Sequence, residues 1–308
     1  MTAWPRSSPV SPAIRSPAVA GAFYPSEREV LGELVDALLD EAGRGPSAAG
    51  PADRAIDPIL GLLVPHAGLV YSGVVAAAGL RLVETTTPDA ALTVVVLGTN
   101  HGAGWLTGVA GWGAGAWRTP LGDVEVDSEL AAAILDLGSP FSLDREAHLG
   151  EHSIEVQLPL LQIVARQARF VPLSVAAGTG EDAIDAGVRL GELLASHRAA
   201  GHRVVLAISS DMAHYPHRQT CALVTDALLP AILGLDPAAL AAEERALLRG
   251  VAPGLVCCMC GIEPAVLGLA ALGAFGANRG IRLASATSAD AGGPPDRTVG
   301  YLAVAFTT

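Results

Sequence analysis

Short apolar runs rich in β-branched residues alternate with helical patterns along this chain, and this alternation constrains its fold more than any other feature. Strands buried on both faces are expected at residues 58–65, 91–98, 169–175 and 202–210. Helices, indicated by apolar residues three and four positions apart, are expected at residues 73–84, 128–137, 153–166 and 181–197. The pattern predicts an α/β fold with a central, mostly parallel sheet flanked by helices. Two last runs, 282–288 and 298–306, predict an antiparallel pair at one side.

The chain has no internal repeat and no linker that would divide its 308 residues, 51% of them hydrophobic. We expect a flexible, proline-rich tail over residues 1–17 and a single α/β domain over residues 18–308. The beginning of the chain lacks the apolar core of a secretory signal, which predicts a cytoplasmic protein with reduced cysteines. Residues 254–277 are strongly apolar, but Glu263 and Pro264 interrupt them, so a buried segment is expected rather than a membrane span.

The charge of the chain excludes several partners and chemistries. A net charge of −12 argues against nucleic acid and against an anionic membrane surface as partners. All 19 basic residues are arginine. The absence of lysine excludes Schiff-base catalysis and the phosphate-binding lysine of nucleotide hydrolases.

Three of the predicted strands are followed closely by a histidine: His66, His101 and His214. The carboxyl ends of parallel strands meet at one edge of a sheet, so these imidazoles are expected to converge there. Converging imidazoles indicate either a metal site or acid/base catalysis, and the pattern leaves both open. Asp211, three residues before His214, is expected to hold that ring in one tautomer. Asn100, next to His101, is expected to contact a bound ligand.

A fourth stretch, "HLGEH", has the spacing of the inverted zinc-peptidase motif, with His148, Glu151 and His152. That motif requires both histidines on one helix, and Gly150 inside it disfavours such a helix. We expect instead that a helix begins near Ser153, with Glu151 and His152 at its entrance facing the bound ligand. The peptidase, and hydrolysis in general, is the least favoured alternative.

The stretch "VCCMCGIEP" carries three cysteines without the paired spacing of a structural zinc site. Cys257 and Cys258 are interpreted as small buried residues. Cys260 differs, because Gly261 after it permits a tight turn and Pro264 suits the first turn of a helix. A thiol close to a helix N-terminus has its thiolate favoured, which is the form that binds a metal ion.

Taken in order, the motifs resemble those of the Memo family, which includes the AmmeMemoRadiSam system protein B of prokaryotes. The matching stretches are "AVAGAFYPS", "LVPHAGLVYSG", "VLGTNHG", "WRTPLGDVEVD", "EHSIEVQLPLL", "ISSDMAHY", "CGIEP" and "GYLAVAF". Two stretches depart from the family pattern: Leu69 stands where an aromatic tyrosine is common, and "GTNHG" replaces the more usual Gly-Pro-x-His. Neither departure touches an expected metal ligand.

The resemblance implies a fold similar to the class III extradiol dioxygenases and a metal site at His66, His101 and Cys260. It places His214 like the acid/base histidine of those enzymes. Asp211, Glu151 and His152 match residues that line the same cleft. Fe(II) is the expected metal and copper the alternative, which favours a redox enzyme. The other interpretation is a non-catalytic module that binds a peptide or protein, with AMMECR-type and radical SAM proteins as expected partners.

Overall fold

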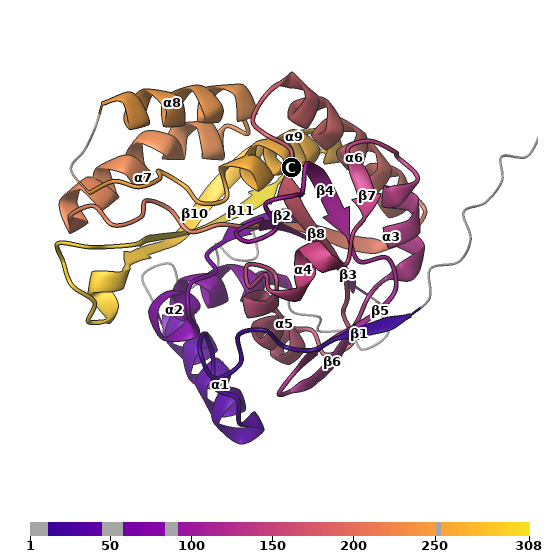
Figure 1. Cartoon of the computed structure of the whole chain (residues 1–308), viewed down its shortest axis with the longest axis horizontal. Coiled ribbons are helices and arrows are strands. Elements are labelled where there is room, and N and C mark those ends of the chain that lie inside the picture. Colours follow the sequence, from indigo (N-terminus) through magenta and orange to yellow (C-terminus); the bar gives the residue numbers. More distant parts are fainter. Residues whose placement is uncertain (1–11, 45–57, 84–91, 251–253) are drawn as a thin grey trace, which may run out of the picture.

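The computed structural model describes residues 12–44, 58–83, 92–250 and 254–308. Within these residues, eight strands form one mixed sheet in the order β10-β11-β2-β9-β3-β8-β4-β7 (Figure 1). Its strands are β2 (Ile59–Val64), β3 (Leu92–Thr99), β4 (Gly108–Gly111), β7 (Phe141–Leu143), β8 (Arg169–Ala176), β9 (Arg203–Ser209), β10 (Arg279–Thr287) and β11 (Gly300–Thr307). The predicted α/β domain with a mostly parallel central sheet is confirmed.

The four predicted buried strands form the middle of this sheet. They are β2, β9, β3 and β8, and each pairs in parallel with its neighbour. Val64 lies opposite Ser209, and Leu97 lies opposite Ile208, so the three strands β2, β9 and β3 end at nearly the same level. The predicted antiparallel pair is also present, as β10 and β11 at one side.

Helices cover both faces of the sheet. The α-helices are α1 (Arg28–Arg44), α2 (Leu69–Leu80), α3 (Ser128–Leu135), α4 (Glu146–Leu149), α5 (Leu158–Val164), α6 (Glu181–Ala199), α7 (Arg218–Leu233), α8 (Pro237–Arg249) and α9 (Ile262–Phe275). Short 3-10 helices are η2 (Arg81–Val83), η3 (Glu155–Gln157) and η4 (Ser288–Ala291). In Figure 1, α1, α2 and α5 lie on one side of the sheet and α6 and α9 on the other.

Alternation along β2 shows how the two helical layers meet the sheet. A Cβ on Gly61 would lie 2.3 Å from the Leu272 side chain of α9, whereas a Cβ on Gly79 of α2 would meet Val64 at 2.7 Å. Successive strand residues face opposite sides, so α9 and α2 pack on opposite faces. Behind α9, the backbone of α6 approaches so closely that a Cβ on Gly191 would lie 2.1 Å from the Ala271 carbonyl oxygen. Of the segment predicted to be buried, 254–277, Ile262–Phe275 form α9 in this layer, whereas Val256 before it is 67% exposed.

The beginning of the described chain is not a loose tail. Ala13–Arg15 form strand β1, which pairs in parallel with β5 (Gly115–Thr119), and β5 pairs with β6 (Gly122–Glu125). Arg15 is buried, and its charge is compensated there by an ion pair with Glu155 and by stacking on Trp117. The tail predicted over residues 1–17 is wrong from Ala13 onward, and residues 1–11 lie outside the described residues.

Two predicted helices differ in extent. The helix expected at 73–84 begins at Leu69, and its predicted end at Glu84 lies outside the described residues. The segment 153–166 contains η3 and then α5, whose start is favoured by a proline in the first turn. Among the described residues, no helix is long and apolar enough to span a membrane.

Candidate metal centre

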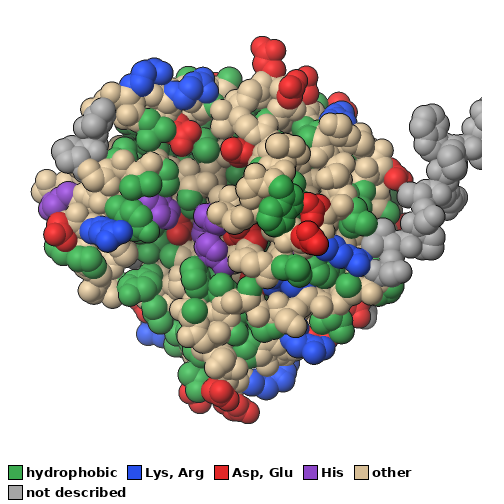
Figure 2. All heavy atoms as spheres, in the orientation of Figure 1, with side chains coloured by type: hydrophobic (Ala, Val, Ile, Leu, Met, Phe, Trp, Pro, Cys, Tyr) green, Lys and Arg blue, Asp and Glu red, His purple; other side chains and the backbone are tan. Residues whose placement is uncertain are grey.

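Three predicted histidines converge at the carboxyl edge of the central strands. His66 follows β2, His101 follows β3 and His214 follows β9, and all three line a cavity of about 590 Å³. Histidine side chains reach the surface near the middle of the face drawn in Figure 2. The cavity wall also contains Phe23, Ala67, Gly68, Tyr71, His152, Asp211, Tyr215, Val256, Cys257, Cys260, Ser288, Gly293, Pro294, Val299 and Tyr301.

The ring of His66 is held in one tautomer by Ser209, the last residue of β9. The Ser209 hydroxyl lies 2.6 Å from the Ser153 carbonyl oxygen, which can only accept, so the hydroxyl proton is donated there. Ser209 Oγ then accepts from Gln157 Nε2 at 2.9 Å and from His66 Nδ1 at 3.1 Å. Burial, reinforced by the neighbouring His152, holds the pKa of His66 well below its usual value. The neutral ring therefore presents a free Nε2 lone pair to the cavity.

Glu151 holds the ring of His101 in the same way. One carboxylate oxygen accepts from His101 Nδ1 at 2.9 Å, and the other accepts from the His101 backbone N–H at 2.7 Å. Burial alone would raise the pKa of Glu151, but the hydrogen bonds from His101 and from the Ser153 backbone lower it well below its usual value. Glu151 accepts the hydrogen bond from Nδ1–H, so the neutral ring of His101 in this tautomer has its Nε2 lone pair free for a metal ion.

His214 is oriented by the backbone and not, as the sequence predicted, by Asp211. Its Nδ1 donates to the Met212 carbonyl oxygen at 2.8 Å, so in the neutral ring Nε2 is the unprotonated nitrogen. Burial lowers the pKa of His214, which keeps the ring a neutral base. Asp211 instead accepts from the backbone N–H groups of His66 and Ala67, at 2.8 and 3.2 Å. Burial raises the pKa of Asp211 to about 7 against the effect of these two bonds.

Cys260 lies beside His66, with 3.2 Å between Sγ and Nε2. Close packing, and not the tight turn that the sequence predicted, explains why a glycine follows Cys260. A Cβ on Gly261 would lie 2.5 Å from Ser210 Cβ, and the φ of Gly261, −97°, is one that any residue can adopt. The helix N-terminus does not leave the thiol ionised as predicted, because burial and then Asp211 raise the pKa of Cys260 well above its usual value. The neutral thiol donates to the bare Nε2 of His66, so an ion that binds both atoms must displace this proton.

His152 belongs to the centre in a way that sequence reasoning missed. Ligand atoms of His66, His101 and His152 lie within 4.8 Å of one another, and the same holds for His66, Asp211 and Cys260. Among the described residues, these two groups could hold a metal ion. The predicted ligands His66, His101 and Cys260 are thus divided between two overlapping groups that share His66. Burial, and then His101, lower the pKa of His152 to about 4.

Two residues expected to contact a ligand have other roles. Asn100 forms hydrogen bonds with Ala103 through both of its side-chain polar atoms, at 2.8 and 2.9 Å, which closes the loop after β3. Glu151 is buried beneath His101 and His152 rather than in the cavity wall. The predicted packing role holds for Cys258, which is fully buried, whereas Cys257 lines the cavity.

The peptidase motif does not form a site. Helix α4 ends at Leu149 with Gly150 as its C-cap, so His148 and His152 do not share a helix. His148 is fully buried, donates Nε2–H to the Ala110 carbonyl oxygen at 3.0 Å and packs against Trp117. Because a carbonyl oxygen can only accept, that nitrogen carries the proton and cannot bind a metal ion.

Comparisons with known proteins find similar sequences over nearly the whole chain. A family model described as "Memo-like protein" matches residues 15–305. A MEMO1 family protein of Methanopyrus kandleri is 37% identical, over 95% of this chain and 98% of its own length. A MEMO1 family protein of Aquifex aeolicus is 36% identical, over 95% of this chain and 99% of its own length.

A crystal structure of an uncharacterized protein from Escherichia coli K12 is similar at 15% identity with a TM-score of 0.44, over 80% of this chain and 99% of its own.

Proposed function

Because the chain belongs to the Memo-like protein family, we propose that its histidine-rich cleft holds one redox-active metal ion and that the protein is an oxidoreductase. The observation that carries the proposal is the tautomer of the rings. His66 and His101 each donate Nδ1–H to a buried acceptor, Ser209 and Glu151, and each therefore points a bare Nε2 into the cavity. Histidine ligands of metal ions are fixed in this way.

The donor atoms fit a transition metal better than magnesium or calcium. His66, His101 and Cys260 are proposed as the protein ligands, with two imidazole nitrogens and one sulfur. Such donors favour iron, copper or zinc, and of these Fe(II) is proposed first and copper second. When bound, the ion would supply Lewis acidity and one-electron chemistry at this position.

His214 is proposed as the general base. It lies in the cavity wall with a neutral ring, an Nδ1–H fixed on Met212 and a free Nε2. A hydroxyl group of a small diol, such as a catechol, would give its proton to this Nε2 and could recover it later. Asp211 supports the reaction indirectly, because it fixes the loop that carries His66.

The second candidate is a non-catalytic module that binds a peptide or protein, and the exposed rim of the cleft favours it. Tyr71, Tyr215 and Val256 line the cavity, yet 47%, 39% and 67% of their surfaces are exposed. Exposed aromatic and aliphatic side chains around a cavity are typical of interaction sites. AMMECR-type and radical SAM proteins are the proposed partners of this second candidate.

Oxygen uptake with a series of catechols, measured on iron-loaded protein, distinguishes the two. If the protein is an oxidoreductase, the wild type should consume oxygen, and Cys260→Ser and His214→Ala should abolish this oxygen uptake. Absence of uptake, together with partner or peptide binding that Cys260→Ser leaves unchanged, would overturn the enzyme and favour the module.

A further inference from the structure

Resting on the metal centre proposed above, we propose that His152 is a further metal ligand, so that the ion lies among three imidazoles beside Cys260. Sequence reasoning assigned His152 to the wall that contacts a substrate. The structure instead brings its ring as close to His66 and His101 as a shared ion requires.

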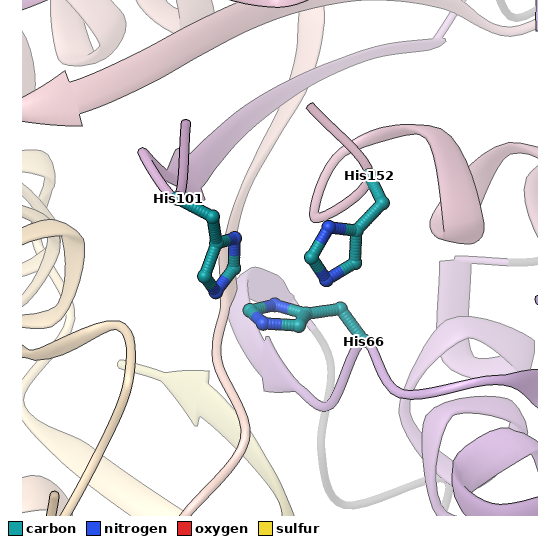
Figure 3. A group of neighbouring side chains, drawn as sticks. All are labelled: His66, His101 and His152. Carbon is teal, nitrogen blue, oxygen red and sulfur yellow. The ribbon is translucent and has the colours of Figure 1, made fainter. Parts of the chain in front are cut away.

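The three rings surround one point (Figure 3). His152 stacks beside His101 with 4.5 Å between ring centroids and 22° between ring planes. Both rings meet His66 edge-on, at 5.4 and 5.2 Å between centroids. In Figure 3, one nitrogen of His101 and one of His152 point to the His66 ring. The ligand atoms of all three residues lie within 4.8 Å of one another, which small rotations of the side chains would bring to the spacing around one ion.

The backbone beside His152 is fixed to the same strand ends that position the other two rings. Ser153 donates its hydroxyl to the Thr99 carbonyl oxygen at the end of β3 and accepts from Ser209 at the end of β9. Gly98 permits this approach, because a Cβ there would lie 2.4 Å from the Ile154 side chain. One set of buried contacts therefore places all three histidines relative to one another.

Glu151 joins His101 and His152 but holds them unequally. The oxygen that accepts from His101 Nδ1 at 2.9 Å lies 3.5 Å from His152 Nδ1, beyond a normal hydrogen bond. The ring of His152 otherwise packs against the ring of Phe23, with 4.6 Å between the ring centroids. His152 is thus the least restrained of the three imidazoles. A ligand that enters the cavity would replace His152 more readily than His66 or His101.

This arrangement gives the centre a variable coordination position. His66, His101, His152 and Cys260 would hold the ion when His152 is bound. If an entering ligand displaced His152, the ion would have one coordination position free for a substrate oxygen. A side chain that merely lined the cavity would affect substrate binding without affecting the ion.

Anaerobic titration with Co(II), followed by visible absorption and competition with a chelator, tests the proposal. His152→Phe keeps an aromatic ring next to Phe23 but removes the ligand nitrogen. His202→Phe, at an exposed histidine far from the cavity, is the matched control. We expect His152→Phe to weaken Co(II) binding by at least about tenfold and to change the ligand-field bands, while His202→Phe matches the wild type.

Circular dichroism and the melting temperature establish that His152→Phe is folded. If folded His152→Phe binds Co(II) with the affinity and spectrum of the wild type, His152 is not a metal ligand, while the centre at His66, His101 and Cys260 stands. If the wild type itself binds no Co(II), or if Cys260→Ser and His66→Ala leave binding unchanged, the proposed centre falls and the further ligand with it.

Discussion

The sulfur of Cys260 lies 3.2 Å from Nε2 of His66, although 194 positions separate the two residues in the chain. The contact forms because β2 and β9 end side by side, while the N-terminus of α9 packs against the end of β9 through Gly261. The centre is therefore a product of the sheet edge, and changes to its supports should affect metal binding without touching a ligand.

Ser209→Ala should weaken metal binding without removing a ligand. The substitution deletes the acceptor of His66 Nδ1–H, so the tautomer and angle of that ring are no longer fixed. Loss of such a supporting contact reduces metal affinity by about 10–100-fold. Ser174→Ala on the neighbouring strand β8 is the control, since its buried hydroxyl has no hydrogen-bond partner among the described residues. Equal affinities for the two variants, measured by chelator competition, would contradict the role given to Ser209.

Gly261→Ala should destabilise the protein and displace Cys260. A methyl group there would overlap Ser210 Cβ at 2.5 Å and Thr99 Oγ1 at 2.9 Å, which we expect to reduce the free energy of unfolding by about 1–3 kcal/mol. Gly273→Ala, within the helix α9 that Gly261 precedes, meets nothing within 4 Å and should stabilise the protein by about 0.5–1 kcal/mol. Urea denaturation of both variants checks the opposite signs.

Glu155→Gln should cause the largest loss of stability among these variants. Glu155 is fully buried and accepts from the side chains of Arg15 and Tyr24 and from the backbone N–H groups of Ala18 and Val19. Neutralising it leaves the buried Arg15 without its counter-ion, at a loss of about 3–5 kcal/mol. Asp123→Asn breaks an exposed pair with Arg118 and should leave the melting temperature nearly unchanged. Similar melting temperatures for the two variants would show that the buried pair does not anchor β1.

Glu244 should make the protein less stable as the pH rises. Burial, with a smaller contribution from Glu263, raises the pKa of this carboxyl group in α8 to about 7, above its usual value of 4.5. Below the lower value the group is protonated in both folded and unfolded chains and contributes nothing. Between the two pKa values only the unfolded chain ionises, so the free energy of unfolding falls as the pH rises. Above about pH 7 both forms are ionised, and the free energy of unfolding falls no further.

Glu244→Gln removes this dependence. The variant should be more stable than the wild type by about 3 kcal/mol at pH 8 and by less than about 0.5 kcal/mol near pH 4.5. Thermal denaturation at both pH values measures the difference. A stabilisation of the same size at both values would mean that Glu244 is not the group responsible.

The sheet and its histidines could be predicted because parallel strands have a strong and local signal. Each β-branched run ends in polar residues, and strands such as β2 and β3 must end at one edge, which brings His66 and His101 together. The tail was wrong because the partner of Arg15, Glu155, lies 140 positions away, and no local pattern reveals such a pair.

The supports of the centre were harder to find. Ser209 lies near the end of the predicted strand 202–210, two residues before Asp211, so a hydroxyl at that position was a signal that could have been used. The roles of Asp211 and Asn100 were not predictable, since each depends on which backbone groups a loop leaves nearby. His152 lies in a loop between two short helices, where no periodic pattern of apolar residues indicates which way a side chain points.

Metal content per chain, measured after anaerobic purification, tests whether the cleft holds one metal ion on His66, His101 and Cys260. We expect close to one iron or copper ion in the wild type. His66→Ala, His101→Ala and Cys260→Ser should lose the ion, while Cys258→Ser and His148→Ala should keep it in a folded protein. An ion that survives Cys260→Ser but disappears in His148→Ala would show that the proposed ligands are wrong.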